Sequence, residues 1–324
     1  MTNVAYSLAQ LERAASVVYE AMSPTPQYTW PLLREAVGTD VWVKHENHTP
    51  TGAFKARGGL VYFHHLTQNG HPHSGVISAT RGNHGQSVGF AARRCGLAAT
   101  IVVPHGNSRE KNAAMRAQGV ELIEHGHDFQ AAFEHAEALA RARGLVKIES
   151  YCDDLVAGVA SYALELFRWC PALDTVYVPI GLGSGISGVM AARDALGRTS
   201  EVVGVVAENA AAYALSFEQK RPVSTNSADT IADGMACRVP NAAALAAIWQ
   251  GAARIVRVCE DEIRAAMRLY FSATHNVPEG AAAAPLAAAL KERAQLAGKR
   301  IALVMSGGNV DRAVFARVLS EAET

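Results

Sequence analysis

Lys55 is the residue whose setting most clearly predicts chemistry. It stands in TPTGAFKARGG, residues 49–59, directly after the apolar pair Ala53 and Phe54 and two positions before Arg57. Burial and a neighbouring cation both disfavour an ammonium ion, so a lysine in this setting has a lowered pKa. Its neutral amine attacks a carbonyl carbon and forms a Schiff base. Most lysines are solvated surface charges, so this interpretation needs a carbonyl ligand close by.

A glycine-rich turn supplies a second candidate site. It follows an apolar segment in TVYVPIGLGSGISGVMAARDALG, residues 175–197. Glycines leave room for backbone N–H groups to face an anion at the positive end of a helix, and phosphate is the natural ligand. A phosphate site together with a nucleophilic lysine indicates pyridoxal phosphate. The alternative is a tight turn that binds nothing. The candidate phosphate contacts are Gly181, Leu182, Gly183, Ser184 and Gly185.

The same segment also permits a different cofactor. Gly183, Gly185 and Gly188 have the GxGxxG spacing that is typical of dinucleotide-binding proteins. Glu208 closes the next apolar segment, roughly where such proteins place an acid for the ribose hydroxyls. On this motif alone, an NAD-dependent dehydrogenase remains open. It leaves the segments around Lys55 and Asn83 unexplained.

A polar turn near residue 80 is the candidate substrate site. In SATRGNHGQSVGFAARRCG, residues 78–96, an apolar segment runs into this turn, and a helical pattern begins near Gly85. N–H groups at a helix start can hold a carboxylate, and an asparagine amide can donate to a phenolic oxygen. Asparagine and histidine also occur in such turns simply as caps. The candidate contacts are Thr80, Arg81, Gly82, Asn83 and His84.

The elements that must position these residues alternate along the chain. Apolar runs separated by longer helical patterns predict an α/β fold of parallel, twisted sheets covered by helices. We expect strands at 41–44, 75–78, 99–103, 121–123, 175–180, 202–207 and 301–305. Helices are expected near the N-terminus and at 85–94, 109–118, 129–142, 157–169, 186–195, 260–273 and 281–297.

The grouping of these elements predicts two domains. Three β–α units in succession predict a small domain of residues 74–149. The segments on either side, residues 1–73 and 150–324, then form a large cofactor-binding domain. Ligands commonly bind between domains, so we expect the active site in the interdomain cleft.

Composition excludes several function classes. Thirty basic residues balance thirty acidic ones, so no net charge favours nucleic acid or an anionic membrane as a partner. Five scattered cysteines without a CxxC pair argue against a disulfide framework and a zinc site. No apolar run is long enough to cross a bilayer, and the N-terminus lacks the features of a signal peptide. We expect a cytoplasmic protein.

Four segments, in this order and spacing, resemble the fold-type II pyridoxal-phosphate enzymes, specifically the serine/threonine dehydratase and serine racemase group. FKARG resembles the Schiff-base motif, GNHGQ the loop that contacts the pyridine 3'-oxygen, GLGSG the phosphate glycines and SGGN the closing motif. The resemblance implies that Lys55 carries the cofactor and that Phe54 lies beside its ring. It further implies that Asn83 contacts the 3'-oxygen, that Ser306 faces the pyridine nitrogen, and that the chain forms a homodimer.

The resemblance also implies a reaction. The group's dehydratases (ammonia-lyases) remove water and ammonia from a 3-hydroxy amino acid by β-elimination and release a 2-oxo acid. This sequence departs from the group at Arg81, where racemases and close dehydratase relatives usually have serine, so we expect little racemase activity. A guanidinium holds carboxylates and stacks on aromatic rings. Arg81 therefore favours a substrate larger than threonine or serine, such as 3-hydroxyaspartate or 3-phenylserine.

Two further expectations follow from departures at other positions. Many members bind a divalent cation through two acidic residues a few positions apart. Glu208 is a candidate for the first of these ligands, but Ala212 and Ala214 follow it where the second acid is expected. The departures at Arg81 and at Val159 also allow a catalytically silent amino-acid sensor on the same fold. Intact Lys55 argues against the sensor.

Overall fold

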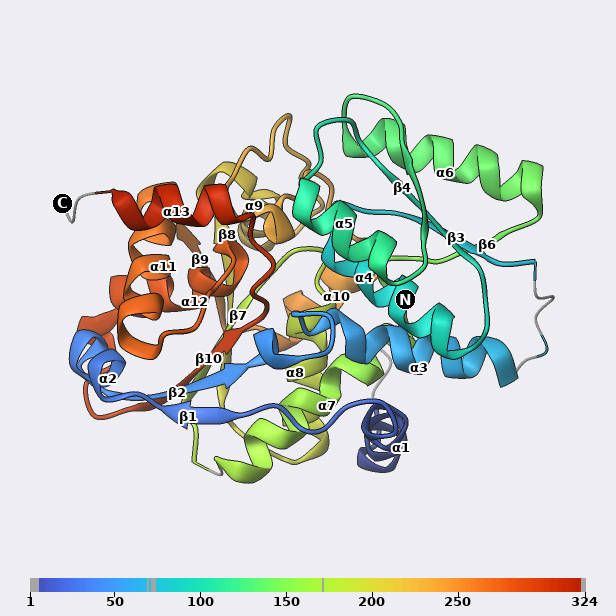
Figure 1. Ribbon diagram of the computed structural model, residues 1–324. Coiled ribbons are helices and arrows are strands. Elements are labelled where there is room, and N and C mark those ends of the chain that lie inside the picture. The colour runs from blue at the N-terminus through green and yellow to red at the C-terminus, as the bar shows by residue number, and fades with distance from the viewer. Residues whose placement is uncertain (1–5, 69, 71–73, 171, 322–324) are drawn as a thin grey trace.

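The computed structural model describes residues 6–68, 70, 74–170 and 172–321, and within them the strands form two separate sheets (Figure 1). The larger sheet has the order β1-β2-β10-β7-β8-β9 and the smaller one β5-β4-β3-β6. All neighbouring strands in them are parallel except β1, which runs antiparallel to β2. The strands are β1 Gln27–Thr29, β2 Asp40–His45, β3 Val76–Ala79, β4 Ala99–Val103, β5 Glu121–Glu124, β6 Val146–Lys147, β7 Thr175–Pro179, β8 Glu201–Ala207, β9 Arg254–Val258 and β10 Arg300–Met305.

Helices cover both sheets and connect their parallel strands. The α-helices are α1 Leu8–Tyr19, α2 Pro31–Val37, α3 Lys55–Gln68, α4 Asn83–Arg94, α5 Arg109–Ala117, α6 Phe129–Arg143, α7 Asp153–Trp169, α8 Ser184–Ala195, α9 Ala212–Gln219, α10 Ala242–Gly251, α11 Glu260–Thr274, α12 Gly280–Lys291 and α13 Arg312–Ser320. Short 3₁₀ segments are η1 Glu46–His48, η2 Glu208–Ala210, η3 Asp233–Met235 and η4 Arg293–Gln295. No helix in the described ranges is long and apolar enough to span a membrane.

The predicted α/β pattern agrees with these elements. Every predicted strand is present, with each end within one residue of its predicted position. Three strands were not predicted, because β1 and β6 are very short and β9 carries two arginines at the edge of its sheet. The predicted helix 281–297 ends earlier, at Lys291. Helix α3 was also not predicted, although it begins at Lys55 itself.

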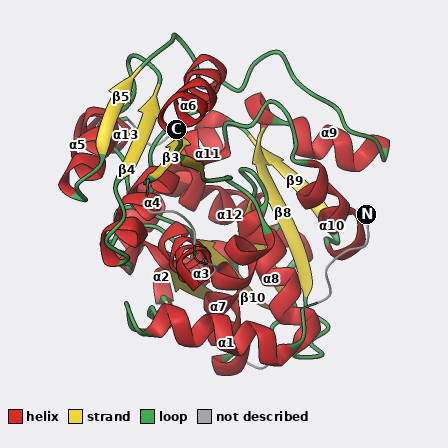
Figure 2. Ribbon diagram, turned by 90° about the vertical axis from the view of Figure 1, so that its right-hand side faces the viewer, coloured by secondary structure: helices red, strands yellow, loops and turns green. Residues whose placement is uncertain are grey.

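Each sheet lies among its own helices (Figures 1 and 2), and the buried apolar residues form separate cores around the two sheets. Helix α12 packs beside the larger sheet and is buried around its whole circumference from Gly280 to Ala289, as expected for an apolar helix inside a protein. The smaller sheet is covered by α4 and α5 on one face and by α6 on the other. The strands of the smaller sheet all fall within residues 74–149. The domain boundaries at 73/74 and 149/150 remain a prediction, and residue 73 lies outside the described residues.

The carboxyl ends of neighbouring strands meet at one edge of each sheet. In the larger sheet, β2, β10 and β7 are adjacent and lead to Lys55, Ser306 and the glycine-rich turn, respectively. In the smaller sheet, β3 leads to the turn that begins at Thr80. Ligands in parallel α/β sheets bind at this edge, so the topology brings the predicted site segments together.

Buried charges fix the start of α3. Arg57 lies in the first turn of the helix and donates to Glu46 at 2.7 Å and to Glu165 at 2.6 Å. Glu165 also pairs with Lys44 at 2.5 Å, and it is the only one of the four side chains with any exposure, at 9%. The cations of Lys44 (β2) and Arg57 (α3) thus balance the carboxylates of Glu46 (η1) and Glu165 (α7). The cluster holds α3 against the larger sheet.

Replacing Arg57 by methionine should destabilise the fold strongly. The substitution leaves Glu46 and Glu165 without their main cation in an environment largely closed to water, which costs about 3–5 kcal/mol in comparable buried pairs. Urea unfolding of the cofactor-free protein measures this loss. Arg143→Met is the control, because Arg143 pairs with Glu121 on the surface and such pairs contribute less than about 1 kcal/mol. Equal unfolding midpoints for the two variants would contradict the role of the cluster.

Candidate active site

The amine of Lys55 lies against the glycine-rich turn. Its Nζ donates to the Ser184 hydroxyl at 2.8 Å and lies 5.1 Å from the centroid of the Phe54 ring. Burial lowers the pKa of Lys55 from its ordinary value of 10.5 to about 8. Lowering the pKa in this way makes the neutral, nucleophilic amine accessible near neutral pH.

The chain before Lys55 is pinned to the end of β10. Phe54 N–H donates to the Ser306 carbonyl at 3.0 Å, and Ala53 forms a bridge with Gly307. Gly52 has a positive φ of 69°, and a Cβ there would lie 2.7 Å from Asn309 Oδ1. Only glycine therefore fits this turn without strain. The turn places Lys55 and Ser306 beside each other.

The glycine-rich turn forms an anion cradle at the start of α8. Gly183 is the N-cap residue with φ 98°, and its carbonyl accepts from Ser187 N–H at 3.0 Å. The N–H groups of Ser184, Gly185 and Ile186 precede this bond, so they have no partner within the helix. At the positive end of the helix dipole, such N–H groups can bind an anion. A Cβ on Gly183 would approach Ala244 Cβ to 2.6 Å.

A tyrosine that was not predicted supports this cradle. The buried Tyr213 hydroxyl donates to the Leu182 carbonyl at 3.0 Å and accepts from Asn241 N–H at 3.0 Å. The first bond joins the turn to α9, and the second joins α9 to the N-cap of α10. No motif marks Tyr213, so sequence reasoning had no signal with which to find it.

Asn83 is held in one orientation by two residues that flank elements of the larger sheet region, Glu279 at the N-cap of α12 and Asn309 after β10. Its Nδ2 donates to Glu279 Oε1 at 2.8 Å, and its Oδ1 accepts from Asn309 Nδ2 at 2.9 Å. An amide nitrogen carries two N–H donors, so one donor of Asn83 remains for a ligand. Glu279 was not predicted. Asn309 belongs to the SGGN segment, but only its serine was assigned a role.

Glu279 is a buried carboxyl group at the N-cap of α12. Its side chain is 3% exposed, and Oε2 has no hydrogen-bond partner among the described residues. Burial raises the pKa of Glu279 to about 7, although Lys111 partly opposes this. The carboxyl group is therefore harder to ionise than that of an exposed glutamate.

The predicted substrate turn brings exposed and buried groups together. Thr80 and His84 are buried, and Gly82 N–H donates to Thr80 Oγ1 at 3.1 Å. Burial lowers the pKa of His84 to about 3, so its imidazole is neutral, and Nε2 has no hydrogen-bond partner in the described ranges. Arg81 is exposed, and its guanidinium has no hydrogen-bond or ion-pair partner within the described part of the chain.

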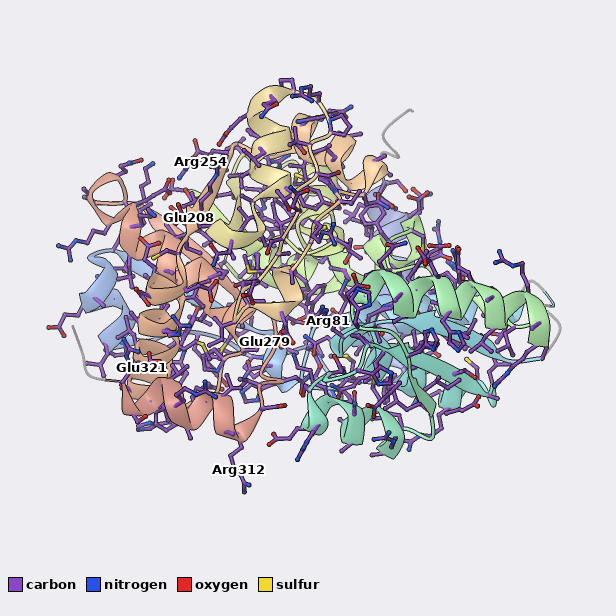
Figure 3. The ribbon with its side chains drawn as sticks, turned by 90° about the horizontal axis from the view of Figure 1, so that it is seen from above. Arg81, Glu208, Arg254, Glu279, Arg312 and Glu321 are labelled. Carbon is purple, nitrogen blue, oxygen red and sulfur yellow. The ribbon has the colours of Figure 1, made fainter. Side chains whose placement is uncertain are left out.

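Arg81 and Glu279 lie near the junction of the two sheet regions, whereas Glu208 lies away from it (Figure 3). Glu208 is exposed at the start of η2. Among the described residues, no three His, Cys, Asp or Glu side chains come together as metal ligands. The structure therefore gives no support to a divalent cation at Glu208.

The geometry fits a small phosphorylated aldehyde. The cradle offers unpaired N–H groups to a phosphate, and a lysine of lowered pKa lies beside it. His84 Nε2 is a buried polar atom without a partner in the described ranges, and a buried group of this kind calls for a ligand. A fold with these features defines an enzyme that binds an aldehyde cofactor through a lysine.

Comparison with known proteins identifies the family. Residues 18–307 match the family model described as pyridoxal-phosphate dependent enzyme, and the chain belongs to this family. It is 32% identical over 291 residues to the L-threonine ammonia-lyase of Thermotoga maritima, which covers 90% of this chain and 72% of that protein.

Two solved structures show how far the fold agrees. A threonine deaminase from T.th. has a TM-score of 0.88 and 31% identity, covering 94% of this chain and 99% of that one. A pyridoxal 5'-phosphate-dependent aspartate racemase has a TM-score of 0.90 and 29% identity, covering 96% of this chain and 98% of that one. The fold is thus that of the fold-type II pyridoxal-phosphate enzymes. Family membership decides for pyridoxal phosphate and against a dinucleotide at the GxGxxG segment.

The reactivity of Lys55 should depend on pH with a midpoint of about 8. The neutral fraction of such an amine rises with pH, from about a tenth at pH 7 to about nine tenths at pH 9. An ordinary lysine stays more than about nine-tenths protonated at pH 9. Cofactor-free protein is mixed with pyridoxal phosphate, reduced with borohydride at each pH, and mapped by peptide mass spectrometry. A midpoint near 10.5 for the Lys55 adduct would contradict the desolvated amine, and Lys55→Ala shows the background.

Proposed function

We propose that the protein is a pyridoxal-phosphate-dependent dehydratase (ammonia-lyase) that converts a 3-hydroxy amino acid to a 2-oxo acid and ammonia. The contact between the Lys55 amine and Ser184, in the first turn of α8, carries the proposal. It joins the nucleophile to the phosphate cradle. The names of the threonine ammonia-lyase and threonine deaminase relatives support the same reaction class.

Each predicted cofactor contact has a role in this proposal. The N–H groups of Ser184 and Gly185 hold the phosphate together with the rest of the turn, which includes Gly181, Leu182 and Gly183. The free N–H of Asn83 would donate to the ring oxygen. Ser306 would contact the ring nitrogen, and Phe54 would pack beside the ring. When bound, the cofactor supplies an electron sink for charge that develops at the substrate Cα.

The residues of the chain handle the proton and the carboxylate. The neutral amine of Lys55 accepts the Cα proton, and its pKa of about 8 suits this base near neutral pH. N–H groups of the turn from Thr80 to His84 hold the substrate carboxylate. Ser306 is a neutral hydroxyl, so it does not force a proton onto the ring nitrogen. With Ser306 in this position, the cofactor would supply a weaker electron sink, which suits loss of the β-hydroxyl.

Arg81 is proposed to select a substrate larger than threonine. Its exposed guanidinium has no partner in the described ranges, and the residue lies within the proposed carboxylate-binding turn. It can pair with a second carboxylate, as in 3-hydroxyaspartate, or stack on the ring of 3-phenylserine. The neighbour named as an aspartate racemase supports a dicarboxylate. The homodimer and the cytoplasmic location remain predictions.

Lys55→Ala should abolish turnover and leave the fold intact. Loss of the proton acceptor lowers kcat by about 10²–10⁴ or more. Release of 2-oxo acid from a panel of serine, threonine, 3-phenylserine and 3-hydroxyaspartate isomers measures this. Wild-type protein that is yellow but converts none of these would instead favour the amino-acid sensor. Full activity in Lys55→Ala would show that another lysine carries the reaction.

Arg81→Ala should lower kcat/KM for the preferred bulky substrate far more than for serine. A charge-assisted hydrogen bond of about 1.5–3 kcal/mol corresponds to a loss of about 10- to 150-fold. If the lost partner is a carboxylate, Arg81→Lys recovers part of the rate, whereas a stacking role recovers little. Equal losses for every amino acid on the panel would contradict a selective role. Appearance of substantial racemase activity in the wild-type protein would contradict the expectation drawn from Arg81.

A further inference from the structure

A buried lysine joins the two sheet regions. Lys111 lies on α5, beside the smaller sheet, and is only 6% exposed. Its Nζ lies 2.5 Å from Asp233 Oδ2 and 3.8 Å from Glu279 Oε2, and both carboxylates belong to the part of the chain that follows β8. Burial alone would lower the pKa of Lys111, but the two carboxylates outweigh it and raise the pKa. Lys111 is therefore a buried cation.

The stem of Lys111 supports the substrate turn. A Cβ added to Gly82 would lie 2.5 Å from Lys111 Cδ and 3.4 Å from its Cβ. The methylene groups therefore pack directly against the turn from Thr80 to His84, at a point where only glycine fits. Any displacement of this stem changes the surface on which the turn rests.

Asp233, the first partner of Lys111, adjoins a residue that packs against the phosphate cradle. Asp233 begins η3, and the carbonyl of the next residue, Gly234, lies so close to Gly181 that a Cβ on Gly181 would overlap it. Gly181 is the first residue of the cradle turn. A shift of Asp233 therefore moves the backbone that presses on the cradle.

Glu279, the second partner of Lys111, contacts the side-chain amide of Asn83, the residue proposed to bind the cofactor ring. Glu279 accepts from Asn83 at 2.8 Å, and this bond is one of the two that set the orientation of the amide. The ammonium of Lys111 lies 3.8 Å from the other carboxylate oxygen, Oε2. Removing that charge changes both the position and the protonation of Glu279, and so the acceptor available to Asn83.

We propose that Lys111 is a positioning residue that couples the substrate turn to the phosphate cradle and to Asn83. The inference rests on the cofactor and substrate sites proposed above. Cofactor binding at the cradle and carboxylate binding at the turn then depend on the same cation. Lys111 does not touch the reacting atoms and acts only through Gly82, Asp233 and Glu279.

Other contacts hold α5 in place without Lys111. The Ser108 hydroxyl donates to Asp311, and the Arg312 backbone N–H donates to Glu110 at 3.0 Å. Both contacts lie at the start of α5 and join it to the N-terminus of α13. Loss of Lys111 therefore loosens the coupling without detaching the helix.

The test is a double-mutant cycle that combines Lys111→Met and Asp233→Asn. The first quantity measured for each variant is the dissociation constant of pyridoxal phosphate. Reconstitution of the cofactor-free protein is followed by the visible absorption band. We expect Lys111→Met to raise this constant by about 10-fold, and the double variant to lose less than the product of the single losses, because the two residues form one unit. Lys111→Arg, which keeps the cation, should recover most of the affinity.

Lys147→Met is the matched control, since Lys147 pairs with Glu137 and Glu149 near the smaller sheet and away from Lys111's partners. It should leave the cofactor affinity unchanged. On the substrate that the wild-type protein turns over, Lys111→Met should raise KM more than it lowers kcat. Wild-type affinity in Lys111→Met, or purely additive losses in the cycle, would overturn the proposal.

The design distinguishes a variant that does not fold, and a failure of the proposed dehydratase activity, from a failure of the proposed role of Lys111. If Lys111→Met does not fold, Asp233→Asn alone decides, because it keeps the lysine and should still weaken cofactor binding while Lys111→Arg stays near wild type. If no amino acid on the panel yields a 2-oxo acid, the proposed dehydratase fails, but the cofactor cycle needs no substrate and still judges Lys111.

Discussion

The removal of one amine from water is the constraint on which the rest of the site depends. Lys55 Nζ lies between the Phe54 ring and the Ser184 hydroxyl, and burial brings its pKa to about 8. The same contact places the amine at the unpaired N–H groups of α8. Nucleophile and anion site are therefore one structural unit, and a phosphorylated aldehyde is the ligand that uses both parts.

Holding that amine requires charge inside the protein. Arg57, Glu46, Glu165 and Lys44 form a balanced, largely buried cluster at the start of α3. Buried pairs contribute little net stability over apolar packing, but they fix geometry because an unpaired member is costly. The cluster thus sets the direction in which Lys55 leaves the helix. The turn at Gly52 and the β-bridge between Ala53 and Gly307 fix the position of Lys55 relative to the end of β10.

The two sheet regions meet through a network of buried polar groups. Asn83, at the start of α4 beside the smaller sheet, is held by Glu279 and Asn309, which leaves one donor. Lys111 supplies the balancing charge for Glu279 and Asp233. In a medium of low polarity, such a network tolerates few alternative arrangements. This is why a residue remote from the reacting atoms can affect both cofactor and substrate.

The amino-acid sequence by itself determined most strands and helices and predicted the four segments of the site, because periodicity, glycine turns and a lysine among apolar residues are local properties. Only the tertiary structure decided that Tyr213, Glu279 and Lys111 belong to it, because each partner lies far away in sequence, 196 residues in the case of Asn83 and Glu279. Such pairs form when strand ends from two sheets converge, and no local pattern encodes that meeting.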